Sequence, residues 1–274
     1  MVARFVRDEE AWGSNPHTPT KENAGKTRPC VFYVIIRHME KIILTKKNGH
    51  EIPCIAEFPD DMRKLVIVIH GYDSSKESQN ATNLMRILPG KGFGVIAYDQ
   101  PHHGSEQAAE EELTVENCLD SLACVEDYLA ERFQMEERLQ TAEDSRQAPE
   151  ICYFGSSFGA YITCIYLATR PHRGRKAFLR CAAVNFPELA LEEGADDVEL
   201  PDLFALYDQA KPEDVQMAFA HGASDSTVKV EAAIEFTERF GYPLTIFPGE
   251  EHTISDDPES PIKVAELAAE LFDS

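Results

Sequence analysis

A serine between glycines carries the clearest chemical signal of this sequence. The letters GSSFG occupy residues 155–159, directly after an apolar run that ends at Phe154 and directly before a helical pattern. A turn this tight between a strand and a helix strains its central residue, and the glycines leave room for the neighbouring elements. The N-terminus of the helix adds positive potential where an oxyanion would form. The pattern predicts Ser157 as a nucleophile, with a plain Gly/Ser connection as the alternative.

A serine nucleophile needs a base, and the base needs a carboxylate that orients it. Asp225 follows a predicted strand over 215–220, and His252 follows another over 243–247. Parallel strands would bring both loops and Ser157 to one edge of a sheet, where the ligand sites of open α/β sheets lie. Taken singly, Asp225 could cap a helix and His252 could be a solvated loop residue. Their order after Ser157 favours a catalytic triad of Ser157, Asp225 and His252.

The oxyanion of an acyl-transfer reaction needs two backbone N–H donors. Phe158 follows the nucleophile and supplies one. The second is predicted at Tyr72, because Gly71 lets the loop after the first core strand turn back toward Ser157. A further loop contains two adjacent histidines at positions 102 and 103, but adjacent side chains on an extended loop point apart. We therefore expect no metal site.

Short apolar runs that alternate with helical patterns must position these residues. Near-continuous Val/Ile/Phe runs indicate strands buried on both faces, and alternation with helices implies parallel pairing with right-handed crossovers. The predicted fold class is α/β, with a mostly parallel twisted sheet and helices on both faces. The predicted strands are 64–69, 94–98, 151–154, 177–184, 215–220 and 243–247, and the clearest helices are 114–133, 227–240 and one that begins with Ser260 as N-cap and Pro261.

The N-terminal part has a different composition. Residues 1–30 are polar and without apolar periodicity, which predicts a poorly ordered arm. Because this arm is featureless, a second hypothesis is that translation begins at Met39. The predicted single domain covers 31–274 and opens with a β-rich block, in which strands are expected over 31–36, 41–45 and 51–58 with a hairpin signal at Asn48-Gly49.

One connection is longer than an ordinary loop. Residues 187–214 separate two predicted strands, which predicts a lid insertion over the site. Its apolar Leu203 and Phe204 are expected to line the acyl side of a substrate pocket, or else to pack within the lid. The segment also carries ten carboxylates against Lys211 alone. These carboxylates disfavour a highly anionic substrate, unless they only face solvent.

The overall charge excludes some classes of protein. The chain has 26 Lys and Arg against 48 Asp and Glu, a formal net charge of −22. So acidic a surface repels phosphate backbones and anionic lipid headgroups, so we expect no nucleic-acid partner and no membrane partner. Seven cysteines without a CxxC pair predict free thiols in a reducing compartment, and no apolar run is long enough for a signal peptide or a membrane span. A cytoplasmic location is expected.

The motifs resemble those of the α/β-hydrolase superfamily, in particular small-lid serine hydrolases of the carboxylesterase, cinnamoyl-esterase, monoacylglycerol-lipase and serine-aminopeptidase type. The resemblance covers about residues 41–273 and is carried by HGY at 70, DQPHHG at 99, GSSFGAY at 155, HGASDSTV at 221 and GEEH at 249. It implies an α/β-hydrolase fold with Ser157 as nucleophile, His252 as base and then acid, Asp225 as its orienting residue, and Tyr72 and Phe158 as oxyanion donors. The elbow and the acid loop also look like the catalytic domain of prolyl-oligopeptidase-type peptidases.

The sequence departs from this family at His102, where members usually carry glycine. A histidine adopts a positive φ only at some cost, so His102 is expected to line the substrate pocket.

The expected function is therefore hydrolysis of a carboxylic ester of a small or medium neutral substrate, through an acyl-enzyme on Ser157 and without cofactor or metal. An aminopeptidase or amidase with the same triad is the first alternative. A non-catalytic ligand-binding protein of the same fold is the second, and the intact triad argues against it. The expected partner is a small-molecule ester or amide, and a homodimer is left open.

Overall fold

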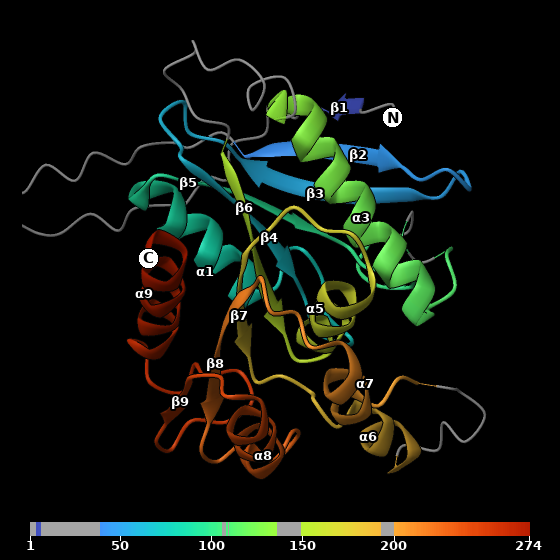
Figure 1. Cartoon of the computed structure of the whole chain (residues 1–274). Coiled ribbons are helices and arrows are strands. Elements are labelled where there is room, and N and C mark those ends of the chain that lie inside the picture. The colour runs from blue at the N-terminus through green and yellow to red at the C-terminus, as the bar shows by residue number, and fades with distance from the viewer. Residues whose placement is uncertain (1–3, 7–38, 106–107, 109, 136–148, 193–199) are drawn as a thin grey trace, which may run out of the picture.

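A mixed sheet of nine strands forms the centre of the protein, as the computed structural model in Figure 1 shows. The structure describes residues 4–6, 39–105, 108, 110–135, 149–192 and 200–274. The order across the sheet is β1-β2-β3-β5-β4-β6-β7-β8-β9. The strands are β1 (Arg4–Val6), β2 (Glu40–Thr45), β3 (Glu51–Glu57), β4 (Lys64–Ile69), β5 (Phe93–Tyr98), β6 (Glu150–Ser156), β7 (Lys176–Arg180), β8 (Gln216–Gly222) and β9 (Leu244–Phe247).

The sheet changes character along its width. The pairs β1-β2, β2-β3 and β3-β5 are antiparallel, whereas the six strands β5, β4, β6, β7, β8 and β9 are parallel to one another. The parallel strands therefore point their carboxyl ends to one edge. The loops after β4, β6, β8 and β9 meet at this edge, which brings together residues far apart in the sequence.

Helices cover both faces of the sheet. α1 and α9 lie against one face, and α3, α5, α7 and α8 pack on the other, which Figure 1 shows as two layers. Among the described residues, no helix is long and apolar enough to span a bilayer. The helices are α1 (Gln79–Ile87), the short 3₁₀ helix η1 (Leu88–Lys91), α3 (Val115–Arg132), α5 (Phe158–Thr169), α6 (Phe186–Glu192), α7 (Leu203–Ala210), α8 (Val230–Phe240) and α9 (Ser260–Asp273).

Side chains along a strand point alternately to the two faces of the sheet, and both faces are buried here, so the apolar runs are unbroken. In β4, Ile67 and Ile69 belong to the core under α3 and α5, while Val66 and Val68 belong to the core under α1 and α9. A strand covered on both sides has no face for polar residues. α3 follows the same logic, because it buries one apolar stripe, and Thr114 caps it by accepting a hydrogen bond from the Asn117 N–H (3.1 Å).

Most predicted elements are confirmed, with shifts at their ends. The strand predicted over 177–184 stops at Arg180, because Cys181 has a φ of 44° and turns the chain. The helix expected from Thr227 begins at Val230, since the Asp225 carboxylate binds the N–H groups of Thr227 and Val228. Ser260 is not the N-cap of α9, because the helix already begins there and Glu259 occupies the cap position.

Part of the N-terminal prediction concerns residues that the structure does not describe. Residues 4–6 of the predicted arm form β1, which pairs with β2. The rest of the arm and the strand expected over 31–36 lie outside the described residues. Within the predicted lid, α6 and α7 are described and residues 193–199 are not.

Candidate active site

Ser157 stands at the sharp turn between β6 and α5. Its backbone has a φ of 52° and a ψ of −118°, a conformation that non-glycine residues rarely adopt. Such a conformation costs about 1–3 kcal/mol and persists only where surrounding contacts enforce it. Here the Ser157 N–H donates to the Arg180 carbonyl (2.9 Å), and the Ser157 carbonyl accepts from the Ala160 N–H (3.0 Å). The turn thus places Ser157 directly beyond the carboxyl end of β6 and before the first residue of α5.

The glycines of the motif are required by close backbone contacts. A Cβ on Gly159 would lie 2.3 Å from the Ile69 carbonyl oxygen and 2.4 Å from the His70 carbonyl oxygen. A Cβ on Gly155 would lie 2.7 Å from the Ala160 Cα. Real Cβ atoms do not approach backbone atoms so closely, so only glycine lets α5 pass beside β4.

We expect the substitution Gly159→Ala to lower the free energy of unfolding by roughly 3 kcal/mol or more, because rigid backbone would have to move. Gly71→Ala is the comparison, since its added Cβ would meet the Ser157 Cβ at the milder distance of 3.1 Å. Urea unfolding of both variants measures the difference. Equal stability of Gly159→Ala and Gly71→Ala would contradict the packing argument.

Three side chains from separate loops form a hydrogen-bonded chain at the sheet edge. His252 Nε2 lies 3.0 Å from Ser157 Oγ, and His252 Nδ1 lies 2.7 Å from Asp225 Oδ2. With the proton on Nδ1, the histidine donates to the carboxylate and accepts the serine hydroxyl proton at Nε2. This is the arrangement in which a histidine acts as a general base toward a serine.

Asp225 is buried and collects several donors. Its Oδ1 accepts from the N–H groups of Thr227 (3.0 Å) and Val228 (2.8 Å), and its Oδ2 lies 3.1 Å from His221 Nε2 as well as beside His252. Burial raises the pKa of Asp225, but the hydrogen bonds from His221, His252 and Val228 outweigh burial and leave the pKa below its ordinary value. Asp225 is therefore a fixed negative charge behind His252.

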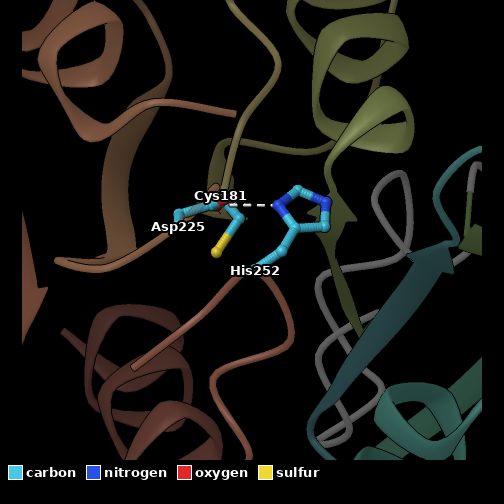
Figure 2. A group of neighbouring side chains, drawn as sticks. All are labelled: Cys181, Asp225 and His252. Carbon is cyan, nitrogen blue, oxygen red and sulfur yellow. Dashed lines mark hydrogen bonds and ion pairs between the residues drawn. The ribbon is translucent and has the colours of Figure 1, made fainter. Parts of the chain in front are cut away.

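Cys181 adds a thiol to this group, as Figure 2 shows with Asp225 and His252. The candidate ligand atoms of the three residues lie within 4.8 Å of one another, and no other group of this kind occurs among the described residues. Burial raises the pKa of the Cys181 thiol to about 11, so the sulfur carries its proton near neutral pH. Asp225 is already bonded to two histidines. These residues fit the hydrogen-bonded chain better than they fit a metal ion, which needs a deprotonated thiol.

Asp99 and His103, which with His102 could suggest a metal site, are hydrogen-bonded to other groups. The Asp99 carboxylate accepts from Lys76 Nζ (2.7 Å) and Ser105 Oγ (2.7 Å). His103 Nδ1 lies 2.8 Å from the Pro101 carbonyl. Asp99 thereby ties the loop after β4 to the loop after β5, and so supports the position of Gly71 and Tyr72.

The buried His70 also holds the loop after β4 in place. Its Nδ1 lies 2.7 Å from the Gly71 carbonyl, and its Nε2 accepts from the Gln100 N–H (3.0 Å). These partners fix the neutral form with the proton on Nδ1, because a proton on Nε2 would face the Gln100 N–H. Burial lowers the pKa of His70 to about 4.

A pH-dependent stability follows for His70. The unfolded chain binds a proton at this histidine below about pH 6.5, whereas the folded chain does so only below about pH 4. Between these values the unfolded state gains protons that the folded state lacks, so acidification destabilises the fold, by up to about 3 kcal/mol at this site. We expect urea titrations of His70→Asn to show a flatter pH dependence than wild type between pH 6.5 and 4.5. His102→Asn, which removes an exposed histidine on the neighbouring loop, is the control, and an unchanged slope in His70→Asn would contradict the argument.

A cavity of about 210 Å³ opens beside Ser157 and His252. Gly71, Tyr72 and Arg180 line it, together with polar side chains from the start of α1. Phe158 is the first residue of α5, and the first N–H groups of a helix have no acceptor within the helix. The structure therefore brings Tyr72 and Phe158, the two predicted oxyanion donors, to the neighbourhood of Ser157.

The predicted substrate-binding residues lie elsewhere. Leu203 is fully buried, and the Phe204 ring packs edge-on to Phe236 of α8 (5.3 Å between ring centroids). Neither lines the cavity, because α7 uses its apolar side to pack on α5 and α8. His102 does have a positive φ, 63°, but its side chain is exposed and also outside the cavity lining.

Two residues near the site were not predicted. His103 is buried and its ring packs edge-on to Tyr72 (5.3 Å). Arg180 lines the cavity and donates from Nη1 to the His252 carbonyl (2.8 Å). A signal for Arg180 was present, since it is the one charged residue in the apolar run 177–184.

Comparison with known proteins agrees with the architecture of the sheet and its helices. A family model described as the alpha/beta hydrolase fold matches residues 64–257. Among curated proteins, none matches this sequence.

Several solved structures resemble the chain over most of its length. Est1E from Butyrivibrio proteoclasticus with bound ferulic acid is 18% identical, with a TM-score of 0.67 over 85% of this chain and 99% of that one. The esterase Pf2001 from Pyrococcus furiosus is 19% identical, with a TM-score of 0.63 over 86% and 93%. XC6422 from Xanthomonas campestris, described as a serine hydrolase without lid, is 15% identical, with a TM-score of 0.60 over 85% and 92%. At these identities the likeness shows the fold alone.

Proposed function

This chain belongs to the alpha/beta hydrolase fold family, and from that premise we propose that it is a serine hydrolase that cleaves carboxylic esters through an acyl-enzyme on Ser157. The observation that carries the proposal is the continuous chain of hydrogen bonds from Ser157 Oγ through His252 to Asp225 (3.0 and 2.7 Å). A ligand-binding protein without catalysis would not need a strained serine aligned with a histidine and a buried carboxylate.

In the proposed reaction, Ser157 Oγ attacks the ester carbonyl while His252 Nε2 takes its proton. Asp225 holds the histidine in the required tautomer and stabilises the imidazolium that forms. The N–H groups of Tyr72 and Phe158 would donate to the oxyanion of the tetrahedral intermediate. His252 then returns the proton to the leaving alcohol.

In the second half of the reaction, hydrolysis of the acyl-enzyme, a water molecule takes the role that Ser157 has in the first half. His252 takes a proton from a water molecule, which attacks the acyl carbonyl, and the proton then returns to Ser157 Oγ as the acid leaves. Every step uses protein groups and water. No step calls for a cofactor.

The cavity supports a small substrate. Its volume of about 210 Å³ is below the roughly 300–1,000 Å³ of pockets for drug-sized ligands. The similar structures Est1E, solved with bound ferulic acid, and Pf2001, an esterase, are in line with ester hydrolysis. An amidase or aminopeptidase with the same triad is the second candidate, because leaving-group preference depends on pocket shape.

The predicted lid belongs to the same proposal. Phe186, at the start of α6, packs against the Phe158 ring (4.8 Å), and Tyr161 of α5 donates to the Pro201 carbonyl (2.7 Å). The segment 187–214 would therefore begin and return close to the nucleophile, with α7 as its fixed base.

The test compares p-nitrophenyl acetate and butyrate with aminoacyl-p-nitroanilides. We expect ester turnover to exceed anilide turnover, and a fluorophosphonate to form one adduct, which peptide mapping places on Ser157. Faster anilide turnover would favour the amidase. An adduct on Ser156, or ester turnover without any adduct, would refute the assignment of the nucleophile.

A further inference from the structure

Arg180 is a buried cation beside the proposed nucleophile. It is the last residue of β7 and pairs in register with Ser156, the last residue of β6. Its side chain is only 4% exposed. The position places a guanidinium under the turn that carries Ser157.

The hydrogen bonds of Arg180 do not reach a carboxylate, and Asp225 acts on its charge only from beyond direct contact. Nε donates to Ser156 Oγ (3.2 Å) and Nη1 donates to the His252 carbonyl (2.8 Å), which are both uncharged acceptors. A guanidinium has five N–H donors, so these two bonds use only part of its capacity. No carboxylate of the described residues lies within 4 Å of it, and the nearby Asp225 is bonded to His221 and His252.

Other cations with little exposure differ in their partners. Lys46 contacts Glu111 at 2.7 Å and the half-buried Lys76 contacts Asp99 at 2.7 Å, whereas the buried Lys176 donates to the Phe272 carbonyl (3.0 Å). Burying an unpaired charge is costly, so proteins rarely retain one without a partner. Among the described buried cations, Arg180 and Lys176 have no side-chain carboxylate within 4 Å, and of these two only Arg180 lines the cavity beside Ser157.

Arg180 is a lining residue of the substrate cavity, and also of a smaller pocket lined by residues of α1 and α9. Arg180, Ser157 and His252 line the substrate cavity together, as do Ser78 and Asn80 at the N-terminal end of α1. The partial positive charge of a helix N-terminus favours an anion in this region. Asp73 also lines the cavity, but it is exposed, so solvent and salt screen the charge of its carboxylate.

We propose that Arg180 is a specificity residue that binds a carboxylate of the substrate, on an ester whose acid group lies a short chain from the scissile carbonyl. The proposal rests on the proposed hydrolase function and names the substrate class of that site. The two oxygens of a carboxylate match the fork of N–H groups on a guanidinium, which makes Arg a better partner for this group than Lys.

The local charge and the net charge predict opposite preferences. The net charge of −22 disfavours anions, but charges on the surface are screened beyond about 8 Å at physiological salt. Arg180 would act by direct contact in a buried site, where Coulomb interactions are several times stronger than in water. For a single carboxylate the local contact decides, and this reverses the expectation of a neutral substrate.

The test uses ethyl esters that differ only in charge. We expect wild type to hydrolyse monoethyl succinate or monoethyl glutarate with a higher kcat/KM than the corresponding diethyl ester. In Arg180→Gln, the ratio of the two kcat/KM values should fall by roughly tenfold or more, as expected for loss of a charge-assisted hydrogen bond. Arg175→Gln is the matched control, because Arg175 precedes the same strand, is exposed and pairs with Asp214, and its loss changes the net charge equally. Its ratio should equal that of wild type.

A purely structural role of Arg180 predicts a different result. If Arg180 only holds the His252 loop, Arg180→Gln lowers both kcat/KM values by the same factor, and this outcome overturns the proposal. Arg180→Lys retains the charge without the fork, so we expect its ratio to lie between those of wild type and Arg180→Gln. If neither variant folds, wild type decides alone, and a preference for the diethyl ester refutes the proposal.

Binding separates this proposal from the proposed function. Ser157→Ala cannot form an acyl-enzyme, yet it should bind monoethyl glutarate more tightly than diethyl glutarate in an NMR titration. If no ester is hydrolysed but this binding preference is found, the hydrolase assignment fails and the carboxylate site stands. Equal binding of both esters refutes the carboxylate site whatever the activity.

Discussion

Ser157→Ala should abolish ester hydrolysis, with kcat for p-nitrophenyl butyrate reduced by roughly 10⁴-fold or more. Ser157 Oγ is the atom that His252 Nε2 contacts at 3.0 Å, and alanine leaves no nucleophile to form the acyl-enzyme. The oxyanion donors and the cavity stay in place, so a small residual rate over water is expected. Initial rates at saturating ester measure the loss, and circular dichroism checks that the variant is folded.

The neighbouring serine is the control for this loss. Ser156 occupies the preceding position, but its hydroxyl accepts from Arg180 Nε and does not contact His252. We expect Ser156→Ala to retain turnover within about tenfold of wild type, because the lost hydroxyl accepts one hydrogen bond from Arg180 and takes no part in the contact between Ser157 and His252. Turnover that survives Ser157→Ala and disappears in Ser156→Ala would show that the nucleophile is misassigned.

Asp225→Asn should lower kcat by roughly 10³–10⁴-fold with little change in cavity shape. An asparagine presents an N–H₂ group to His252 Nδ1, which favours the tautomer with the proton on Nε2. That nitrogen then faces Ser157 as a donor and cannot take the hydroxyl proton. The variant also loses the negative charge that stabilises the imidazolium.

Glu251→Gln is the matched control for Asp225→Asn. Glu251 is adjacent to His252 in the chain, and its carboxylate accepts from the Ser226 N–H and hydroxyl, both at 3.0 Å. The change removes one negative charge from the same pair of loops without touching the histidine ring. We expect less than about threefold loss of kcat. Comparable losses in the two variants would mean that Asp225 acts only through loop structure.

The fold could be predicted because its signals are local. Unbroken apolar runs marked strands covered on both sides, and the rule that parallel strands end at one edge sufficed to group Ser157, Asp225 and His252. The ends of elements were less predictable. β7 stops at Arg180 because Cys181 adopts a positive φ, and no propensity scale anticipates such a residue.

The lining of the cavity could not be predicted, because it depends on side-chain packing between distant elements. Leu203 and Phe204 are apolar as an acyl pocket requires, but the same property lets α7 pack on α8. Arg180 is recognisable in the sequence as the one charged residue of an apolar run, but the run itself indicates only a core strand and not what the side chain contacts. Only the register of β6 and β7 shows that the residue reaches Ser156.

Arg180 also limits how the substrate preference of this protein could change during evolution. Its carbonyl accepts from the Ser157 N–H and its guanidinium donates to the His252 carbonyl, so one residue touches the loops of both nucleophile and base. The backbone bond survives any substitution, whereas the side-chain bond does not. A lineage that replaced Arg180 to accept other substrates would first weaken the support of His252. Compensating changes near residues 252–254 would therefore have to precede or accompany the replacement, a form of epistasis that makes substrate preference slow to drift.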